Sequence, residues 1–307
     1  MDKRKTGIAL FITLMVIASI MSIIAVSFSY LEKAQKDAGS ISALIQANIL
    51  YGNTSDILRK FFPKGSKDSK KLNLLYTLPL ALTEEESGFM LNMRCQPLIT
   101  SVPINWLDEE SFINVPEKST LAKDILLYIV DLYNLENPNG LEKMLLEAIT
   151  GKSFTNKDYK SRLKIQKGII SKQQFMRIIT DYALKYNDRQ ALSIPWEKYF
   201  TFIKVNDETL IDGAYPSAEF ISAAFDIPIE TIQDDWINDI TTGQVTTLSS
   251  FLKDNNYINP PNKKIYATKA INAMHCEQKF IYKNNQYGFK FNYIEGRSSN
   301  FEFNGQE

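Results

Sequence analysis

The chain has 307 residues, 44% hydrophobic and 23% charged, with a formal net charge of zero. This length accommodates one membrane anchor and one or two folded domains, and the charge balance leaves no electrostatic footprint for nucleic acid. One histidine, His275, and two cysteines, Cys95 and Cys276, exclude the usual four-ligand zinc site and leave one candidate for a histidine-based triad. Because the sequence also has no phosphate loop, nucleophile elbow or HExxH motif, we expect a protein that is not an enzyme.

The N-terminus carries a membrane-anchor pattern. Basic residues 3–5 and then Gly7 precede an uncharged run over residues 8–31. The run exceeds the ~20 apolar residues that span a bilayer, and it is longer than the ~7–15-residue apolar region of a signal peptide. The positive-inside rule places the basic end in the cytoplasm and the bulk of the chain outside. No second run of this length follows, so the sequence predicts a single crossing.

The helical pattern continues beyond the apolar run. No proline occurs between it and Pro63, although Gly39 and Gly52 weaken the helix. Apolar residues recur at helical spacing, namely Ile41, Leu44, Ile45 and Ile49, then Ile57, Leu58 and Phe61. The pattern predicts one helix over 8–62, roughly 80 Å long at about 1.5 Å per residue. We expect its first half to lie in lipid and its second half to lay this stripe on a soluble domain.

A basic leader that ends in glycine, followed by such a helix, resembles the type IV prepilins and pseudopilins. The resemblance implies that a prepilin peptidase cuts after Gly7 and methylates the new N-terminus, Ile8. Most members carry glutamate at the fifth mature position, which pairs with a neighbouring subunit's N-terminal amine, but this chain has Ile12 there. Loss of that glutamate is typical of the K-type minor pseudopilin of type II secretion systems (the general secretion pathway protein K family). The alternative is a plain signal anchor with a chance glycine.

Strands and helices then alternate in blocks. Residues 63–71 read as a turn, residues 72–82 as an apolar stretch of unclear type, and residues 89–100 as a strand pair interrupted by Pro97. Helices are expected over Leu121–Leu132, Leu141–Ile149, Ser171–Tyr186, Ser217–Phe225 and Ile229–Ile240. The tail predicts strands over Lys264–Lys269, Lys279–Lys283 and Tyr287–Ile294, with a turn at Asn284-Asn285 and a short edge at Phe301–Phe303.

Strands on both sides of a helical block indicate an insertion into one sheet domain. We therefore predict an α+β fold with a basic leader (1–7), a transmembrane and stem helix (8–62), a pilin-like αβ body (63–112), an α-helical insertion (113–260) and returning strands (261–307). This order again resembles the K-type minor pseudopilin, in which a large helical domain interrupts the pilin-like body. Residues 46–62 and 169–224 are similar to its stem and its second helical half. Asp212 departs from the asparagine-rich form usual in the family.

The two cysteines fall in or beside the two strand regions that would share one sheet. With this topology they lie in an oxidising compartment. A bond between Cys95 and Cys276 would tie the split domain together and contribute about 4 kcal/mol in the chain-entropy model. Two buried free thiols are the equal alternative, because the sequence cannot place the two Cα atoms within bonding distance.

Acidic clusters are the remaining candidates for chemistry. They are Glu84-Glu85-Glu86, Asp108-Glu109-Glu110 and Asp234-Asp235. Some K-type pseudopilins bind calcium through such loops, but none of these has an EF-hand pattern, and solvated turns are the ordinary interpretation. No second Cys or His lies near His275-Cys276 in sequence, so we expect no metal site and no cofactor, with calcium left open by the resemblance.

The resemblance implies a minor pseudopilin that caps the tip of a type II secretion pseudopilus, initiates its assembly and supports protein export. The implied partners are the I- and J-type minor pseudopilins, the major pseudopilin and the prepilin peptidase, with no nucleic acid. The implied location is the bacterial inner membrane, with the bulk of the chain in the periplasm. Two alternatives stay open. One is a minor pilin of a type IV pilus or DNA-uptake machine, and the other is a membrane-anchored periplasmic enzyme or binding protein.

Overall fold

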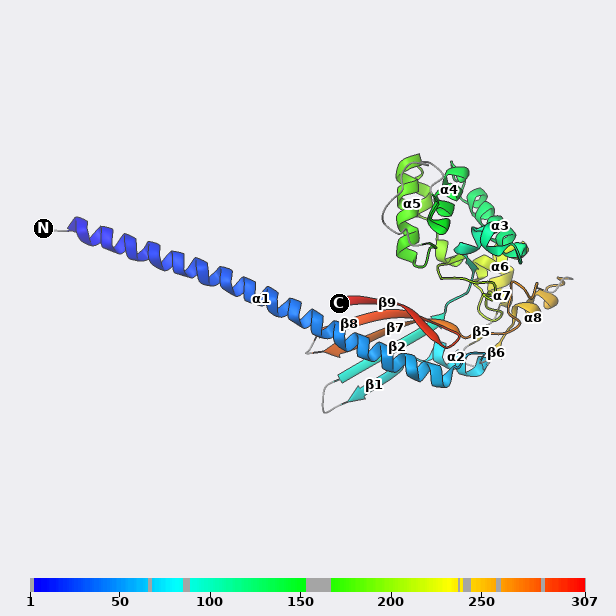
Figure 1. The fold of residues 1–307 in the computed structure, drawn as a ribbon, viewed down its shortest axis with the longest axis horizontal. Helices are drawn as coiled ribbons and strands as arrows, with labels where there is room; N and C mark the ends of the chain where they lie inside the picture. Colours follow the sequence, from blue (N-terminus) through cyan, green and yellow to red (C-terminus); the bar gives the residue numbers. More distant parts are fainter. Residues whose placement is uncertain are drawn as a thin grey trace.

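The computed structural model describes residues 3–65, 68–84, 89–152, 167–236, 238–239, 244–257, 261–282 and 285–306. Helix α1 (Lys3–Phe61) runs unbroken for 59 residues, through both Gly39 and Gly52. Its N-terminal half projects away from the body, and its C-terminal half lies along a sheet (Figure 1). Along this helix up to residue 38, side chains are described only at 15, 21–30 and 33. The helix ends at Phe61, two residues before Pro63, close to the predicted end at residue 62.

Five antiparallel strands form the main sheet. They are β1 (Leu80–Glu84), β2 (Phe89–Pro97), β7 (Ala273–Tyr282), β8 (Asn285–Ile294) and β9 (Arg297–Gln306), in the order β1-β2-β7-β8-β9. Strands β2 and β7 come from opposite sides of the helical block and pair directly, with Cys95 opposite Cys276. The mixed helix and sheet of the predicted α+β class is confirmed, and one sheet is built from both ends of the block.

Three strand predictions need correction. The predicted strand pair over 89–100 is instead one strand, β2, which ends at Pro97, and its partner β1 begins in the apolar stretch that precedes it. Residues 264–269 are not a strand of the main sheet but a turn and bend, joined to the helical part by a bridge between Ile211 and Tyr266. The backbone at Ala267 lies so close to Gly213 that a side chain at that glycine would clash with it. The short edge at 301–303 is the ten-residue strand β9. Asn284 lies outside the described residues, and Asn285 begins β8.

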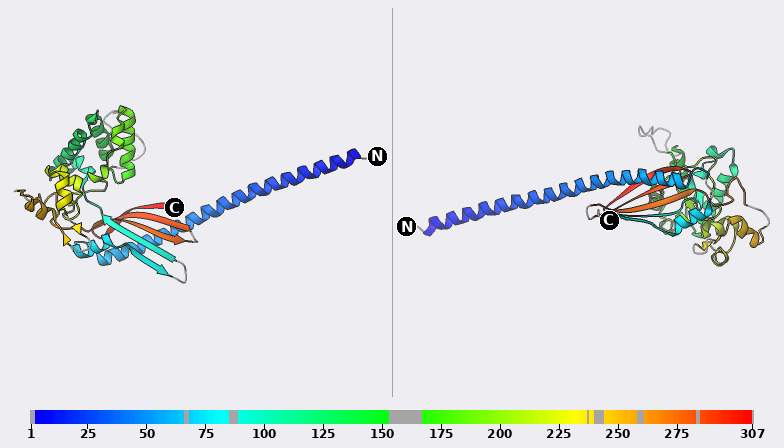
Figure 2. Two further views of the ribbon diagram at one scale, coloured as in Figure 1. Left: turned by 180° about the vertical axis from the view of Figure 1, so that it is seen from behind. Right: turned by 90° about the horizontal axis from the view of Figure 1, so that it is seen from below.

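Helices α1 and α2 (Ser69–Thr77) cover one face of the sheet, as the three views agree (Figures 1 and 2). Alternation along β7 sets this face: Met274, Cys276 and Gln278 are fully buried, whereas the intervening His275 and Glu277 are partly exposed. A half-buried antiparallel strand alternates in this way because successive side chains point to opposite faces. The disulfide and the C-terminal half of α1 therefore lie on the same side of the sheet.

The remaining elements form a helical part at the other end of the molecule (Figure 1). Its helices are α3 (Pro116–Leu132), α4 (Pro138–Thr150), α5 (Lys172–Tyr186), α6 (Ala218–Phe225), α7 (Ile229–Asp235) and α8 (Leu248–Asp254). Short 3-10 turns lie at η1 (Ile104–Leu107), η2 (Glu109–Phe112), η3 (Arg189–Leu192) and η4 (Trp196–Lys198). Two small pairs, β3 (Val102–Pro103) with β4 (Phe200–Thr201) and β5 (Asn238–Asp239) with β6 (Gln244–Val245), complete it.

Capping residues and proline set where several of these helices begin. Ser171 and Ser217 accept from the backbone N–H three residues on, opening α5 and α6 as the sequence predicts. Helix α3 starts at Pro116, earlier than expected, because proline is favoured at the first helical position. Helix α7 ends at Asp235, short of the predicted Ile240, and strand β5 follows.

The two parts meet at different residues from those expected. Residues 102–107, assigned by sequence to the sheet body, belong to the apolar core of the helical part, as do Ile265 and Tyr266. The core between sheet and α1 resumes at Ala270. The core of the helical part therefore begins by Val102, not at 113, and extends to Tyr266, beyond the predicted end at 260.

Candidate assembly site

Helix α1 has an inner face of small and aromatic side chains that packs on the sheet. Ala43 and Ala47 are fully buried in one core cluster with Phe289 and Phe291 of β8. The Tyr51 ring lies against Phe291 at a centroid separation of 5.3 Å, an edge-on arrangement that aromatic pairs favour. Two alanines one turn apart let the helix backbone approach the aromatic side chains of the sheet closely.

Polar contacts fix the same face. The Thr54 hydroxyl donates to Oε1 of Gln278 at 3.0 Å in a buried contact between α1 and β7. At the end of the helix, the carbonyl of Phe62 accepts from the Tyr293 hydroxyl at 2.6 Å and from Nδ2 of Asn272 at 2.7 Å. Buried hydrogen bonds of this kind fix the position of the helix, because breaking one leaves a desolvated polar group unpaired.

The outer face of α1 carries the large aliphatic residues and is uncovered. Ile41 is 61% exposed, Ile45 58% and Ile49 52%, and Ile57 and Phe61 on the following turns are also exposed. The prediction that this stripe packs on the chain's own domain is wrong for all of its members except Leu58, which is buried. The inner face uses Ala43 and Ala47 in their place. An apolar stripe along several helical turns that faces away from its own core marks an interaction surface.

The projecting half of α1 continues this exposure. Met21, Ile23, Phe28 and Tyr30 are each more than 60% exposed. Among the residues whose side chains are described, no helix meets the length and apolarity of a membrane span. Most of the predicted span over 8–31, and the side chains of the predicted processing and assembly residues Gly7, Ile8 and Ile12, lie outside that described set.

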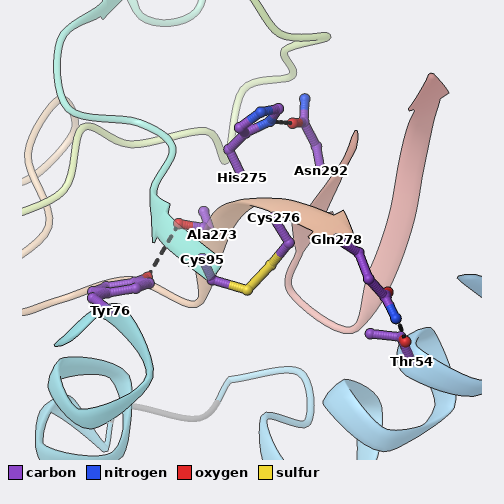
Figure 3. The surroundings of a disulfide bond; sticks show 8 residues. All are labelled: Thr54, Tyr76, Cys95, Ala273, His275, Cys276, Gln278 and Asn292. Carbon is purple, nitrogen blue, oxygen red and sulfur yellow. Dashed lines mark hydrogen bonds between the residues drawn. A yellow bond between two sulfur atoms is a disulfide. The ribbon is translucent and has the colours of Figure 1, made fainter. Parts of the chain in front are cut away.

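A disulfide joins the two strands that flank the insertion (Figure 3). Cys95 and Cys276 are paired residues of β2 and β7, both buried, with the bond on the side of the sheet that faces the helices. Of the two states that the sequence leaves open, the structure has the bonded one. His275 lies on the opposite side of β7 with Nδ1 2.7 Å from Oδ1 of Asn292 (Figure 3). The histidine thus has a polar partner on the neighbouring strand.

Asp212 lies at the junction between the sheet and the helical part, where it is fully buried. One carboxylate oxygen accepts from the backbone N–H groups of Ala214 at 2.7 Å and Tyr215 at 3.1 Å, and the other accepts from that of Ile271 at 3.0 Å. Burial raises the pKa of this carboxyl to about 6, and the three N–H donors oppose that rise. Asp212 therefore fastens the segment after β4 to the segment before β7, a role that the sequence did not indicate.

The central acidic cluster is paired with lysines. Glu109 lies 2.6 Å from Nζ of Lys123, and Glu110 pairs with Lys152, which lowers the pKa of the Glu110 carboxyl. The side chains of residues 84–86 lie outside the described set. Across the described ranges, no group of three or more metal-ligating side chains is assembled. The two glutamates of this central cluster thus pair with lysines.

Comparisons with known proteins complete the description. No family model matches the sequence, and no curated protein matches it. Among solved structures, the chain is similar to a chain of the GspK-GspI-GspJ complex from the type 2 secretion system of enterotoxigenic Escherichia coli. The match covers 86% of this chain and 98% of that chain, with 10% sequence identity and a TM-score of 0.47.

Proposed function

We propose that this chain is a minor pseudopilin of a type II secretion system, acting in filament assembly and not in catalysis. The observation that carries the proposal is the uncovered outer face of α1. Ile41, Ile45 and Ile49 offer an apolar stripe to a second helix, while the inner face is already occupied by the sheet. In a filament of such subunits, helix would pack on helix and bury the stripe.

The exposed projecting half extends that surface toward the N-terminus. We infer that it anchors the chain in the bacterial inner membrane with the body in the periplasm, and that it leaves the bilayer by packing against neighbouring helices. A prepilin peptidase would first cut after Gly7 and methylate Ile8. The partners proposed are other minor pseudopilins of the I and J types and the major pseudopilin.

The helical part supports a position at the tip. It lies at the end of the sheet opposite to the N-terminus of α1 (Figure 1), where a further subunit would stack in a growing filament. The bulk of the helical part would prevent another subunit from stacking there. Ile12 in place of the usual glutamate fits a subunit with no neighbour ahead, since no N-terminal amine would need a partner.

Intact-mass analysis of protein purified from its native membrane tests processing. We expect a chain that starts at N-methylated Ile8, and we expect a Gly7→Arg variant to keep its leader. A wild-type chain that still carries Met1–Gly7, in cells with an active prepilin peptidase, would contradict both the pseudopilin and the pilin hypotheses. It would favour an anchored periplasmic protein.

A further inference from the structure

A hollow of about 970 Å³ opens between the sheet and the helical part. Residues from five segments distant in sequence line it: Ile99, residues 64–65 after α1, and residues within 203–210, 263–273 and 294–299. Its volume is at the upper end of the range for binding pockets, which is roughly 300–1,000 Å³. None of the contacts of α1 described above uses it.

The floor of the hollow is apolar. Ile99, Ile203 and Ala273 are buried in a small cluster of their own, separate from the two main cores, and Ile271 and Ile294 pack against it while also lining the hollow. This cluster joins the β7 end of the sheet to the segment after β4. An occupant would therefore meet aliphatic side chains at the bottom.

The rim is cationic. Lys64, Lys204, Lys263, Lys269 and Arg297 line the hollow, against only two carboxylates, Glu208 and Glu295. All five cations are exposed. The charged residues that line the hollow therefore have a net charge of +3, whereas the whole chain has a net charge of zero.

Within the part of the chain that the structure describes, none of these five cations takes part in an ion pair. Throughout the described ranges, the ion pairs within 4.0 Å use other basic residues, for example Lys123 with Glu109 and Lys264 with Glu117. Glu295, which could neutralise one of the five, instead accepts from the backbone N–H of Gly65 at 2.6 Å. Unpaired charge of one sign around an apolar floor favours an anionic occupant with apolar groups.

We infer that this hollow, named here the junction groove, binds an acidic peptide segment of a partner protein in which carboxylate and aliphatic side chains alternate. In an extended segment, successive side chains point to opposite sides, so one set would reach the apolar floor and the other the cationic rim. Inorganic phosphate would satisfy the rim alone and leave the floor uncovered. The inference does not rest on the proposed function, because it uses no residue of the outer face of α1.

Fluorescence polarisation on the full chain in zwitterionic nanodiscs tests the inference. The probe is a short labelled peptide in which Glu alternates with Leu, and the matched probe carries Gln in place of Glu. We expect saturable binding of the acidic probe alone. We also expect it to weaken at least about tenfold in the Lys204→Glu/Lys263→Glu variant, which reverses charge at the rim.

The control variant is Lys70→Glu/Lys253→Glu, which makes the same charge change at exposed lysines outside the groove. We expect it to bind the acidic probe within about twofold of the wild type, after the general charge effect is allowed for. Equal loss in both variants, equal binding of both probes, or no saturable binding would overturn the inference. So would oleate that occupies the groove while the peptide fails to compete. N-terminal processing is unaffected by any of these results, so the two proposals fail separately.

Discussion

The two faces of the C-terminal half of α1 differ in the size of their side chains and in what covers them. The inner face has alanines, a tyrosine and a threonine against the sheet, with Leu58 near its end, and the outer face has isoleucines and a phenylalanine that no residue the structure describes covers. Hydrophobicity alone would assign the isoleucines to the core. The difference shows that close packing of a helix on aromatic strands selects small residues, and that the larger apolar residues remain available for a second molecule.

The largest expected effect on stability comes from removing the disulfide in the sheet on which the inner face packs. The disulfide closes a loop with a sequence separation of 181 residues. Replacing both cysteines, as Cys95→Ala/Cys276→Ala, should lower the free energy of unfolding by about 4–5 kcal/mol in the chain-entropy model. Thermal unfolding followed by circular dichroism measures the loss. Reductant should shift the wild type toward the variant and leave the variant unchanged, and an unchanged melting temperature in the variant would contradict the prediction.

The next effect concerns the junction beside that sheet. Since burial raises the folded-state pKa of Asp212 from 3.8 to about 6, the stabilising effect of its protonation is present below about pH 4 and is lost as the pH rises through about 6. The wild type should therefore lose on the order of 3 kcal/mol across this window relative to an Asp212→Asn variant. Denaturant unfolding at pH 4.5, about 6 and about 7.5 gives the free energy of unfolding of both proteins, and the slopes of this free energy against pH are then compared. Parallel slopes would show that Asp212 does not titrate there.

A smaller loss is expected from crowding the inner face. Ala47 is fully buried, so Ala47→Leu must displace the helix or the rings beneath it. Overpacking of this kind costs about 1–3 kcal/mol. Chemical denaturation of the full chain measures it, with Ala47→Gly as the control that removes volume instead. If Ala47→Leu is as stable as the wild type, the helix does not lie closely on the sheet.

The smallest stability effect is expected on the outer face. Ile49 is 52% exposed, so Ile49→Ser should change the free energy of unfolding by less than about 0.5 kcal/mol. Assembly should suffer nonetheless, because the substitution removes part of the apolar stripe. Denaturation and a secretion assay on the same variant separate the two readouts. A large stability loss would place Ile49 in the chain's own core and reverse the assignment of the two faces.

Much of the fold was accessible from the sequence because periodicity and caps act locally. Ser171 and Ser217 open their helices where predicted, and the order of strand and helix blocks indicated the split sheet. The orientation of α1 was not accessible by the same reasoning, because the apolar stripe was assumed to face the core. A usable signal was present in the helical spacing of Ala43, Ala47, Leu58 and Phe62, which form the buried face.

The junction was the hardest part to predict. Asp212 interrupts no helix or strand pattern, and its three backbone partners come from residues up to 59 positions away. The junction groove likewise gathers Lys64, Lys204 and Arg297 from segments with no common motif. Only the tertiary arrangement brings these charges together, so a one-dimensional pattern could not show them.

Photo-crosslinking in living cells tests the outer-face assignment most directly. A benzoylphenylalanine residue is placed at Ile49 in the otherwise unaltered chain, and the adducts are separated and identified by mass. The account predicts an adduct to the apolar N-terminal helix of another processed pseudopilin, and its loss when Gly7→Arg blocks processing. Adducts confined to this chain's own sheet would contradict the account, because Ile49 would then belong to the inner face.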